Sequence, residues 1–170
     1  MASREAPLVF ASVRDAQALA TMSRDLIEAG LGWEYRRDRV ARLIGDADTV
    51  TLVSRDDLRI AGFAAMTFGD ERAHLVLLAV RPPYQRRGIG RRLLEWLVES
   101  AMTAGVASIH VELRASNSAA FAFYRAAGFA ETLRVPGYYR GGETAVRMIR
   151  MLRAPGGAIQ MWRPPTLDCR

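Results

Sequence analysis

The spacing of apolar residues along the chain predicts alternating strands and helices. Short apolar runs predict strands at residues 8–13, 49–54, 59–68, 73–80, 108–114, 129–135 and 144–152. Apolar residues at helical spacing predict helices at residues 15–27, 35–44, 90–104 and 118–127, each closely followed by a glycine. The sequence therefore predicts an α/β (α+β) fold, in which about four helices cover a mixed sheet of about seven strands.

Three of these elements carry a clear burial pattern. Residues 75–80 are all apolar, which is typical of a strand covered on both faces. The strand at 108–114 alternates, so its two faces are predicted to carry Ile109, Val111 and Leu113 on one side and His110, Glu112 and Arg114 on the other. The helix at 90–104 has a predicted apolar stripe of Leu93, Leu94, Leu97, Val98, Ala101 and Met102.

Length and composition narrow the function classes. The 170 residues fit one domain, placed at residues 1–153, with a Pro/Gly-rich tail at 154–170. All 24 basic residues are arginine, against 18 acidic residues, so the net charge is +6 and a P-loop, which requires lysine, is excluded. The single Cys169 excludes a cysteine-rich zinc site, and we expect no metal. With no apolar run of about 20 residues and no secretory signal pattern, we expect a cytoplasmic protein without a membrane partner.

Residues 85–90 (QRRGIG) form a candidate phosphate site between a buried strand and an amphipathic helix. The start of a helix presents unpaired N–H groups and the positive end of the helix dipole. Gly88 and Gly90 leave these amides accessible, and five arginines crowd the segment 81–92. The alternative interpretation is a glycine turn beside a solvated basic helix end. A dinucleotide fingerprint is excluded because Leu93 occupies the position of its third glycine.

Candidate acid–base residues lie in the next strand and helix. Glu112 is predicted to be partly buried, a setting that suits a general base, but the strand alone favours a simple pairing with Arg114 or with a neighbouring strand. Asn117 and Tyr124 are seven residues apart, two helical turns, so both would project on one face. The alternatives are that Asn117 caps the helix and Tyr124 belongs to the core.

Together these motifs resemble the GNAT superfamily of acetyl-CoA-dependent N-acetyltransferases over residues 8–152. Residues 85–90 fit the family's coenzyme A loop, (Gln/Arg)-x-x-Gly-x-(Gly/Ala). Within the superfamily the sequence is most similar to the RimI type, which acetylates the N-terminal alanine of a ribosomal protein. This similarity is carried by residues 111–117 (VELRASN), 123–124 (FY), 127–129 (AGF) and 138–139 (YY), followed by Glu143.

The resemblance implies a splay between the fourth and fifth strands, acetyl-CoA as cosubstrate, and a set of roles. The coenzyme A contacts would come from Leu78, Ala79, Val80, Gln85, Arg86, Arg87, Gly88, Ile89, Gly90, Arg91 and Asn117. Glu112, often through water, would be the base for the incoming ammonium, and Tyr124 the acid for the leaving thiolate. The acceptor would contact Trp33, Tyr138 and Tyr139. The amine would attack the thioester directly in a ternary complex, so no protein nucleophile is required.

The acceptor stays open at this point. Residues 30–35 (GLGWEY) replace the Pro-Trp-Ser-like turn that is usual in the RimI type. A protein or peptide N-terminal amine is favoured, with a lysine side chain or a small amine such as a polyamine or aminoglycoside as alternatives. Two other classes are a non-catalytic coenzyme A-binding regulator and, less favoured, nucleic-acid binding by the arginines at 81–92. Either a monomer or a homodimer is expected.

Overall fold

The computed structural model describes residues 6–57, 59–140 and 142–153, so the predicted tail at 154–170 lies outside the described residues. The strands are β1 Leu8–Phe10, β2 Thr49–Asp56, β3 Arg59–Phe68, β4 Arg72–Val80, β5 Ser108–Arg114, β6 Ala130–Val135 and β7 Ala145–Met151. The helices are α1 Ala16–Leu26, α2 Arg37–Gly45, α3 Ile89–Thr103 and α4 Ser118–Ala126, with short 3-10 turns at Val13–Asp15 and Pro82–Tyr84. The predicted order of elements is confirmed.

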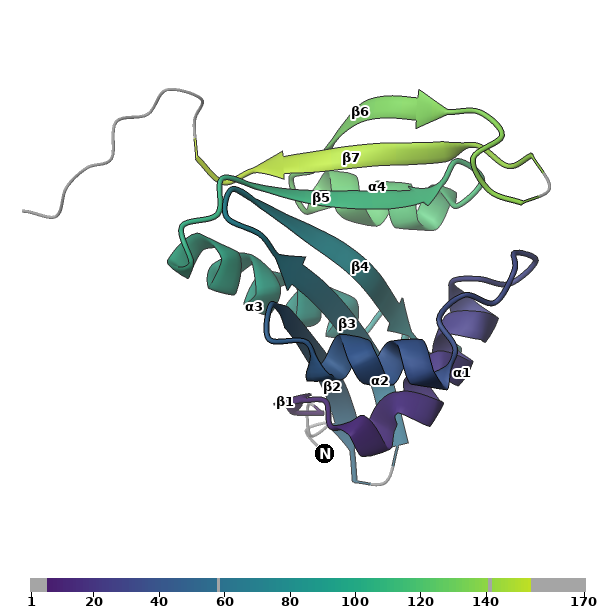
Figure 1. Cartoon of the computed structure of the whole chain (residues 1–170), viewed down its shortest axis with the longest axis vertical. Helices are drawn as coiled ribbons and strands as arrows, with labels where there is room; N and C mark the ends of the chain where they lie inside the picture. Colours follow the sequence, from purple (N-terminus) through teal and green to yellow (C-terminus); the bar gives the residue numbers. More distant parts are fainter. Residues whose placement is uncertain (1–5, 58, 141, 154–170) are drawn as a thin grey trace, which may run out of the picture.

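The seven strands form one sheet in the order β1-β2-β3-β4-β5-β7-β6. All neighbours are antiparallel except β4 and β5, which run parallel. These two strands pair only from Arg72 with Ser108 to Leu75 with Val111, and beyond that point they diverge (Figure 1). The predicted splay between the fourth and fifth strands is confirmed.

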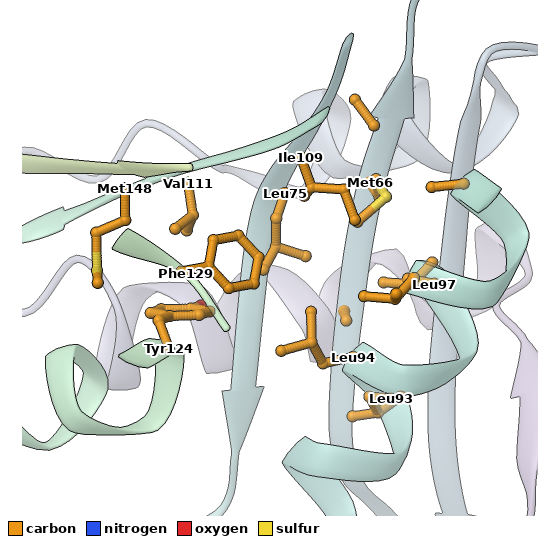
Figure 2. Close-up of a cluster of buried hydrophobic side chains, with 14 of the residues drawn as sticks. Met66, Leu75, Leu93, Leu94, Leu97, Ile109, Val111, Tyr124, Phe129 and Met148 are labelled. Atoms are coloured by element: carbon orange, nitrogen blue, oxygen red, sulfur yellow. The ribbon is translucent and has the colours of Figure 1, made fainter. Parts of the chain in front are cut away.

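Helices cover the sheet from both sides and define two cores. The first core lies under α3 and α4 and includes Leu93, Leu97, Val111 and Phe129 (Figure 2). The second core lies under α1 and α2, which cover β2, β3 and β4 from the opposite face (Figure 1). Because β4 contributes to both cores, the prediction of a strand covered on both faces is confirmed.

A β-bulge in β4 lies at the start of the splay. Leu75 is opposite Met66 and Leu77 is opposite Ala65, so Val76 is an extra residue without a partner on β3. The extra residue reverses the alternation of the strand: Leu75 packs in the first core, whereas Leu77 packs in the second. The bulge thus sets which side chains of β4 face α3 at the open end of the sheet, and the alternation of the sequence did not predict it.

Other boundaries differ locally from the predictions. β1 ends at Phe10, not at residue 13, because the Ser12 N–H donates to Asp15 Oδ2 and starts a 3-10 turn. The two faces of β5 are as predicted, with the apolar side chains buried and the polar ones half-buried. Met102, assigned to the apolar stripe of α3, is instead 57% exposed, so that assignment was wrong.

Within the described ranges, no helix is long and apolar enough to cross a membrane.

Candidate active site

A cleft of about 1160 Å³ opens where β4 and β5 separate. Its floor is the polar face of β4, β5 and β7, which α1 and α2 do not cover. Two loops flank it, the acceptor loop at residues 27–36 after α1 and the tyrosine loop at residues 136–144 after β6; Figure 1 shows them facing each other at the open end of the sheet. Six of the residues predicted for the site line this cleft: Leu78, Glu112, Asn117, Tyr124, Tyr138 and Tyr139.

Glu112 lies on the floor of the cleft and is paired with an arginine. Arg147 is directly opposite on β7, and its Nε donates to Glu112 Oε2 over 2.8 Å. The alternative that Glu112 pairs with a neighbouring strand is therefore confirmed, and Arg114 is not its partner. A hydrogen bond from Tyr138 to Glu112 raises the pKa of that phenol. Only a fifth of the Glu112 side chain is exposed, so its carboxylate is fixed in orientation rather than free in solvent.

Tyr124 is at once a core residue and a cleft residue. The residue is 7% exposed, and its ring packs edge-on against Phe129 at 5.5 Å between centroids (Figure 2). The ring of Phe123 packs against it in the same way at 5.1 Å. Burial raises the pKa of Tyr124 well above that of a free phenol. The hydroxyl is therefore neutral at physiological pH, which keeps it a hydrogen-bond donor.

Asn117 is the N-cap of α4. Its Oδ1 accepts a hydrogen bond from the Ala120 N–H over 3.0 Å, which confirms the capping alternative. The cap uses the oxygen of the amide, and the Nδ2 group carries the two N–H donors that remain. Both Asn117 and Tyr124 line the cleft.

Among the described residues, the edge of β4 that faces the splay has no partner strand beyond Leu75. The Arg81 N–H donates to the Ala61 carbonyl on β3 over 2.8 Å, and in a strand alternate residues point their N–H and C=O groups to opposite sides. Val80 and Leu78 therefore direct their backbone groups away from β3, into the gap. The Gln85 side chain donates to the Val80 carbonyl over 2.8 Å, which ties the following loop to this edge.

The loop at 85–91 brings the start of α3 to the same end of the gap. Gly88 is the N-cap at φ +78°, in the left-handed region where a side chain is strained. The first helical hydrogen bond of α3 is donated by the Arg92 N–H, so the amides of residues 89–91 precede the ladder. No side chain of the described residues caps this terminus. A Cβ on Gly90 would lie 3.5 Å from Val80 Cγ2, an ordinary van der Waals distance, so the start of α3 lies close to the end of β4.

The acceptor loop is held by buried polar contacts. The sequence did not predict these contacts. Glu28 is 7% exposed and accepts hydrogen bonds from Ser23 Oγ at 2.9 Å and from the Glu34 and Tyr35 N–H groups at 2.7 and 3.3 Å. Arg114 donates to the Ile27 carbonyl over 2.6 Å, which fastens the end of α1 to the end of β5. No local motif in the sequence marked these long-range contacts.

Arg114 also joins the tyrosine loop to β5. Its Nη1 atom lies 3.6 Å from Oε2 of Glu143. The other carboxylate oxygen of Glu143 accepts a hydrogen bond from Ser116 Oγ. Tyr139 is half-buried in that loop, and burial together with the charge of Glu112 raises its pKa to about 12. Arg114 therefore holds both walls of the cleft.

Trp33 lies away from the cleft. Its indole packs against the second core and donates from Nε1 to the Tyr35 carbonyl over 3.1 Å. The guanidinium groups of Arg24 and Arg36 lie 5.3 and 5.4 Å from its ring centroid. Trp33 is not among the residues that line the cleft, so an acceptor contact by this side chain stays a prediction.

Both histidines of the chain line the cleft. His74 on β4 and His110 on β5 are directly opposite each other in the parallel ladder, where the two strands still pair. Burial lowers the pKa of both imidazoles, which are therefore mainly neutral at pH 7. No group of three or more potential metal-ligating side chains occurs among the described residues.

Comparison with known proteins assigns the fold to a family. The sequence model of the acetyltransferase (GNAT) family matches residues 19–129. The [Ribosomal protein bS18]-alanine N-acetyltransferase of Salmonella typhimurium is 43% identical over 95 residues, which cover 54% of this chain and 64% of that relative. An N-alpha-acetyltransferase of Saccharolobus solfataricus is 37% identical over 82 residues, covering 48% and 49% of the two chains. These matches thus span less than two thirds of each relative's length.

A solved structure covers more of the chain. The ribosomal-protein-S18-alanine N-acetyltransferase of Escherichia coli superimposes with a TM-score of 0.75 and 28% sequence identity, over 90% of this chain and 97% of that one. The family model alone spans more than half of the sequence, and the superposition extends the similarity to the flanking elements. This chain belongs to the acetyltransferase (GNAT) family.

Proposed function

We propose that this protein transfers the acetyl group of acetyl-CoA to a primary amine, and that the acceptor is the N-terminal amine of a protein or peptide. The observation that carries the proposal is the splay of β4 from β5. It opens the edge of β4 directly beside the start of α3 and beside the cleft that holds Glu112 and Tyr124.

The described residues fit acetyl-CoA as a substrate. The amides at the start of α3, with Gln85, Arg86, Arg87 and Arg91 around them, suit the pyrophosphate. The pantetheine arm contains amide groups, which match the backbone groups that Leu78 and Val80 direct away from β3. Ala79, also predicted to contact coenzyme A, lies between them and directs its own backbone groups towards β3. Asn117 lines the cleft, and its Nδ2 group would donate to that arm.

The chemistry requires two proton transfers and no protein nucleophile. The amine nitrogen attacks the thioester carbonyl carbon, the N–C bond forms and the C–S bond breaks. Glu112 takes the proton that the ammonium loses, directly or through water, and Tyr124 gives its proton to the departing thiolate. The Val80 N–H, which points into the gap, would stabilise the negative charge that develops on the carbonyl oxygen. After the attack the nitrogen loses a second proton, which restores Tyr124 through water, and Glu112 releases its proton to solvent, so one proton is released per turnover.

An N-terminal amine suits this site because its pKa is about 8, against about 10.4 for a lysine side chain. Near neutral pH a single carboxylate, even one that already binds Arg147, is therefore sufficient to remove the proton from an N-terminal ammonium. Relatives named as ribosomal-protein-alanine N-acetyltransferases support a protein amine as the acceptor. Tyr138 and Tyr139, which line the cleft beside Glu112, would contact the first residues of the acceptor.

Thiol release from acetyl-CoA tests the proposal directly. The panel contains N-terminal peptides, including that of ribosomal protein bS18, together with lysine peptides that have blocked N-termini, polyamines and aminoglycosides. We expect turnover with one or more of the free N-terminal peptides and little with the blocked lysine peptides. Turnover confined to polyamines or aminoglycosides would show that the acceptor is a small amine rather than a protein N-terminus. Coenzyme A binding without turnover of any acceptor would favour a regulator.

A further inference from the structure

Among the described residues, the end of the cleft between the acceptor loop and the tyrosine loop contains one arginine without an ion pair. Arg140 belongs to the tyrosine loop and lines the cleft. It lies across from the acceptor loop, because a Cβ on Gly32 would be 3.4 Å from Arg140 Nη1 and 3.6 Å from its Cδ. The guanidinium therefore lies against Gly32 on the opposite wall, between the two loops that flank the cleft.

The other arginines at this end are engaged. Arg39 pairs with Glu34 at 3.1 Å, Arg114 with Glu143 at 3.6 Å and Arg147 with Glu112 at 2.8 Å. Arg140 makes neither an ion pair nor a hydrogen bond within residues 6–57, 59–140 and 142–153.

The carboxylates of the cleft are also committed. Glu34 and Glu112 each bind an arginine, and Glu28 accepts hydrogen bonds from one hydroxyl and two backbone N–H groups. The lining as a whole carries five arginines and three glutamates, and the second arginine without an ion pair, Arg72, is at the far end beside His110. Arg140 is exposed, and each carboxylate of the described lining already has other partners.

We propose that Arg140 binds a carboxylate of the acceptor, so that the preferred substrates are peptides with Asp or Glu within the first few residues after the acetylated amine. Guanidinium and carboxylate groups match in shape and charge and form paired hydrogen bonds. The position of Arg140 at the mouth, outside the acid–base pair, makes it a specificity determinant rather than a catalytic residue. This inference rests on the proposed transfer to an N-terminal amine.

The test compares acceptor peptides that differ only in charge. Sets of C-terminally amidated peptides carry Glu, Gln or Lys at position 2, 3 or 4, so that a side chain is the only possible carboxylate. We expect the Glu peptide of the best set to exceed its Gln counterpart by about tenfold in kcat/KM, as suits a charged hydrogen bond that is partly open to solvent. The Lys peptide should be the poorest of the set.

Variants assign the preference to Arg140. Arg140→Gln should bring the Glu-to-Gln ratio close to one, and Arg140→Glu should reverse the order so that the Lys peptide is favoured. Arg134→Gln is the matched control, because Arg134 is an exposed arginine of β6 that pairs with Glu131 and does not line the cleft. This control should keep the wild-type ratio.

The outcomes separate this inference from the function on which it rests. Equal kcat/KM for Glu and Gln peptides in every set, or an unchanged ratio in Arg140→Gln, would overturn the role of Arg140 while leaving acetyl transfer intact. Absence of turnover with every peptide, despite coenzyme A binding, would instead count against the proposed function itself.

Discussion

Replacement of Tyr124 by phenylalanine separates chemistry from packing at the proposed reaction centre. Tyr124 packs through its ring, at 5.1 Å from Phe123 and 5.5 Å from Phe129, and phenylalanine keeps these contacts. Across the described residues, no hydrogen bond to its hydroxyl is found, and the oxygen is not sealed in the core. The substitution should therefore change the free energy of unfolding by less than about 0.5 kcal/mol.

The effect on catalysis follows from the leaving group. A thiol has a pKa of about 8.5, which lies about 1.5 units above pH 7. At that pH the protonated thiol is therefore favoured over the free thiolate by about thirtyfold. Loss of the acid should thus lower kcat by about thirtyfold, or about 2 kcal/mol in the barrier, and the deficit should shrink as the pH approaches 8.5. The KM for acetyl-CoA should stay within about twofold.

Steady-state kinetics at several pH values, with thermal unfolding of the same samples, measure these quantities. Tyr84→Phe is the matched control, since it also removes one phenolic hydroxyl but from a residue outside the cleft. A Tyr124→Phe enzyme with wild-type kcat would remove Tyr124 as the acid. An equal loss in kcat and in stability would show that the residue acts through packing.

Three further predictions concern the base, the loop and the histidines. Glu112→Gln should move the pH optimum upward, because the acceptor amine must then lose its proton unaided near its pKa of about 8; superimposable pH–rate profiles would exclude the base role. Gly88→Ala forces a side chain into φ +78°, so it should cost about 1 kcal/mol in denaturant titrations and weaken coenzyme A binding in calorimetry, whereas Gly45→Ala, at a glycine without positive φ and with open space around it, should leave affinity unchanged. The pKa of His74 is lowered by burial, so the unfolded chain binds the proton first as pH falls below 6.5 and stability declines; His74→Gln should flatten that decline, and an unchanged acid limb would argue against it.

The sequence predicted the fold to a large extent, because the fold depends on local periodicity. The run at 75–80 and the alternation of β5 specify which faces are buried, and both were confirmed. The loop at 85–90 was recognisable because a helix start without a capping side chain and a left-handed glycine have a local signature. Each of these features depends only on residues that are close together in the sequence, so the sequence alone can indicate it.

Pairings between distant residues were not accessible in this way. Arg147 binds Glu112 because the register of β5 and β7 places them opposite each other, and no spacing in the sequence encodes that register. Val76 is a bulge only relative to β3. Glu28 is a buried carboxylate whose partners follow it by six and seven residues in a loop without a repeating pattern.

A structure of the protein with coenzyme A bound tests the central claim most directly. We expect the pyrophosphate within hydrogen-bond distance of the amides at the start of α3, the pantetheine arm along the edge of β4 at Leu78 and Val80, and the thiol near Tyr124 and Glu112. Coenzyme A bound on another surface, or with its thiol directed away from Tyr124, would contradict the account.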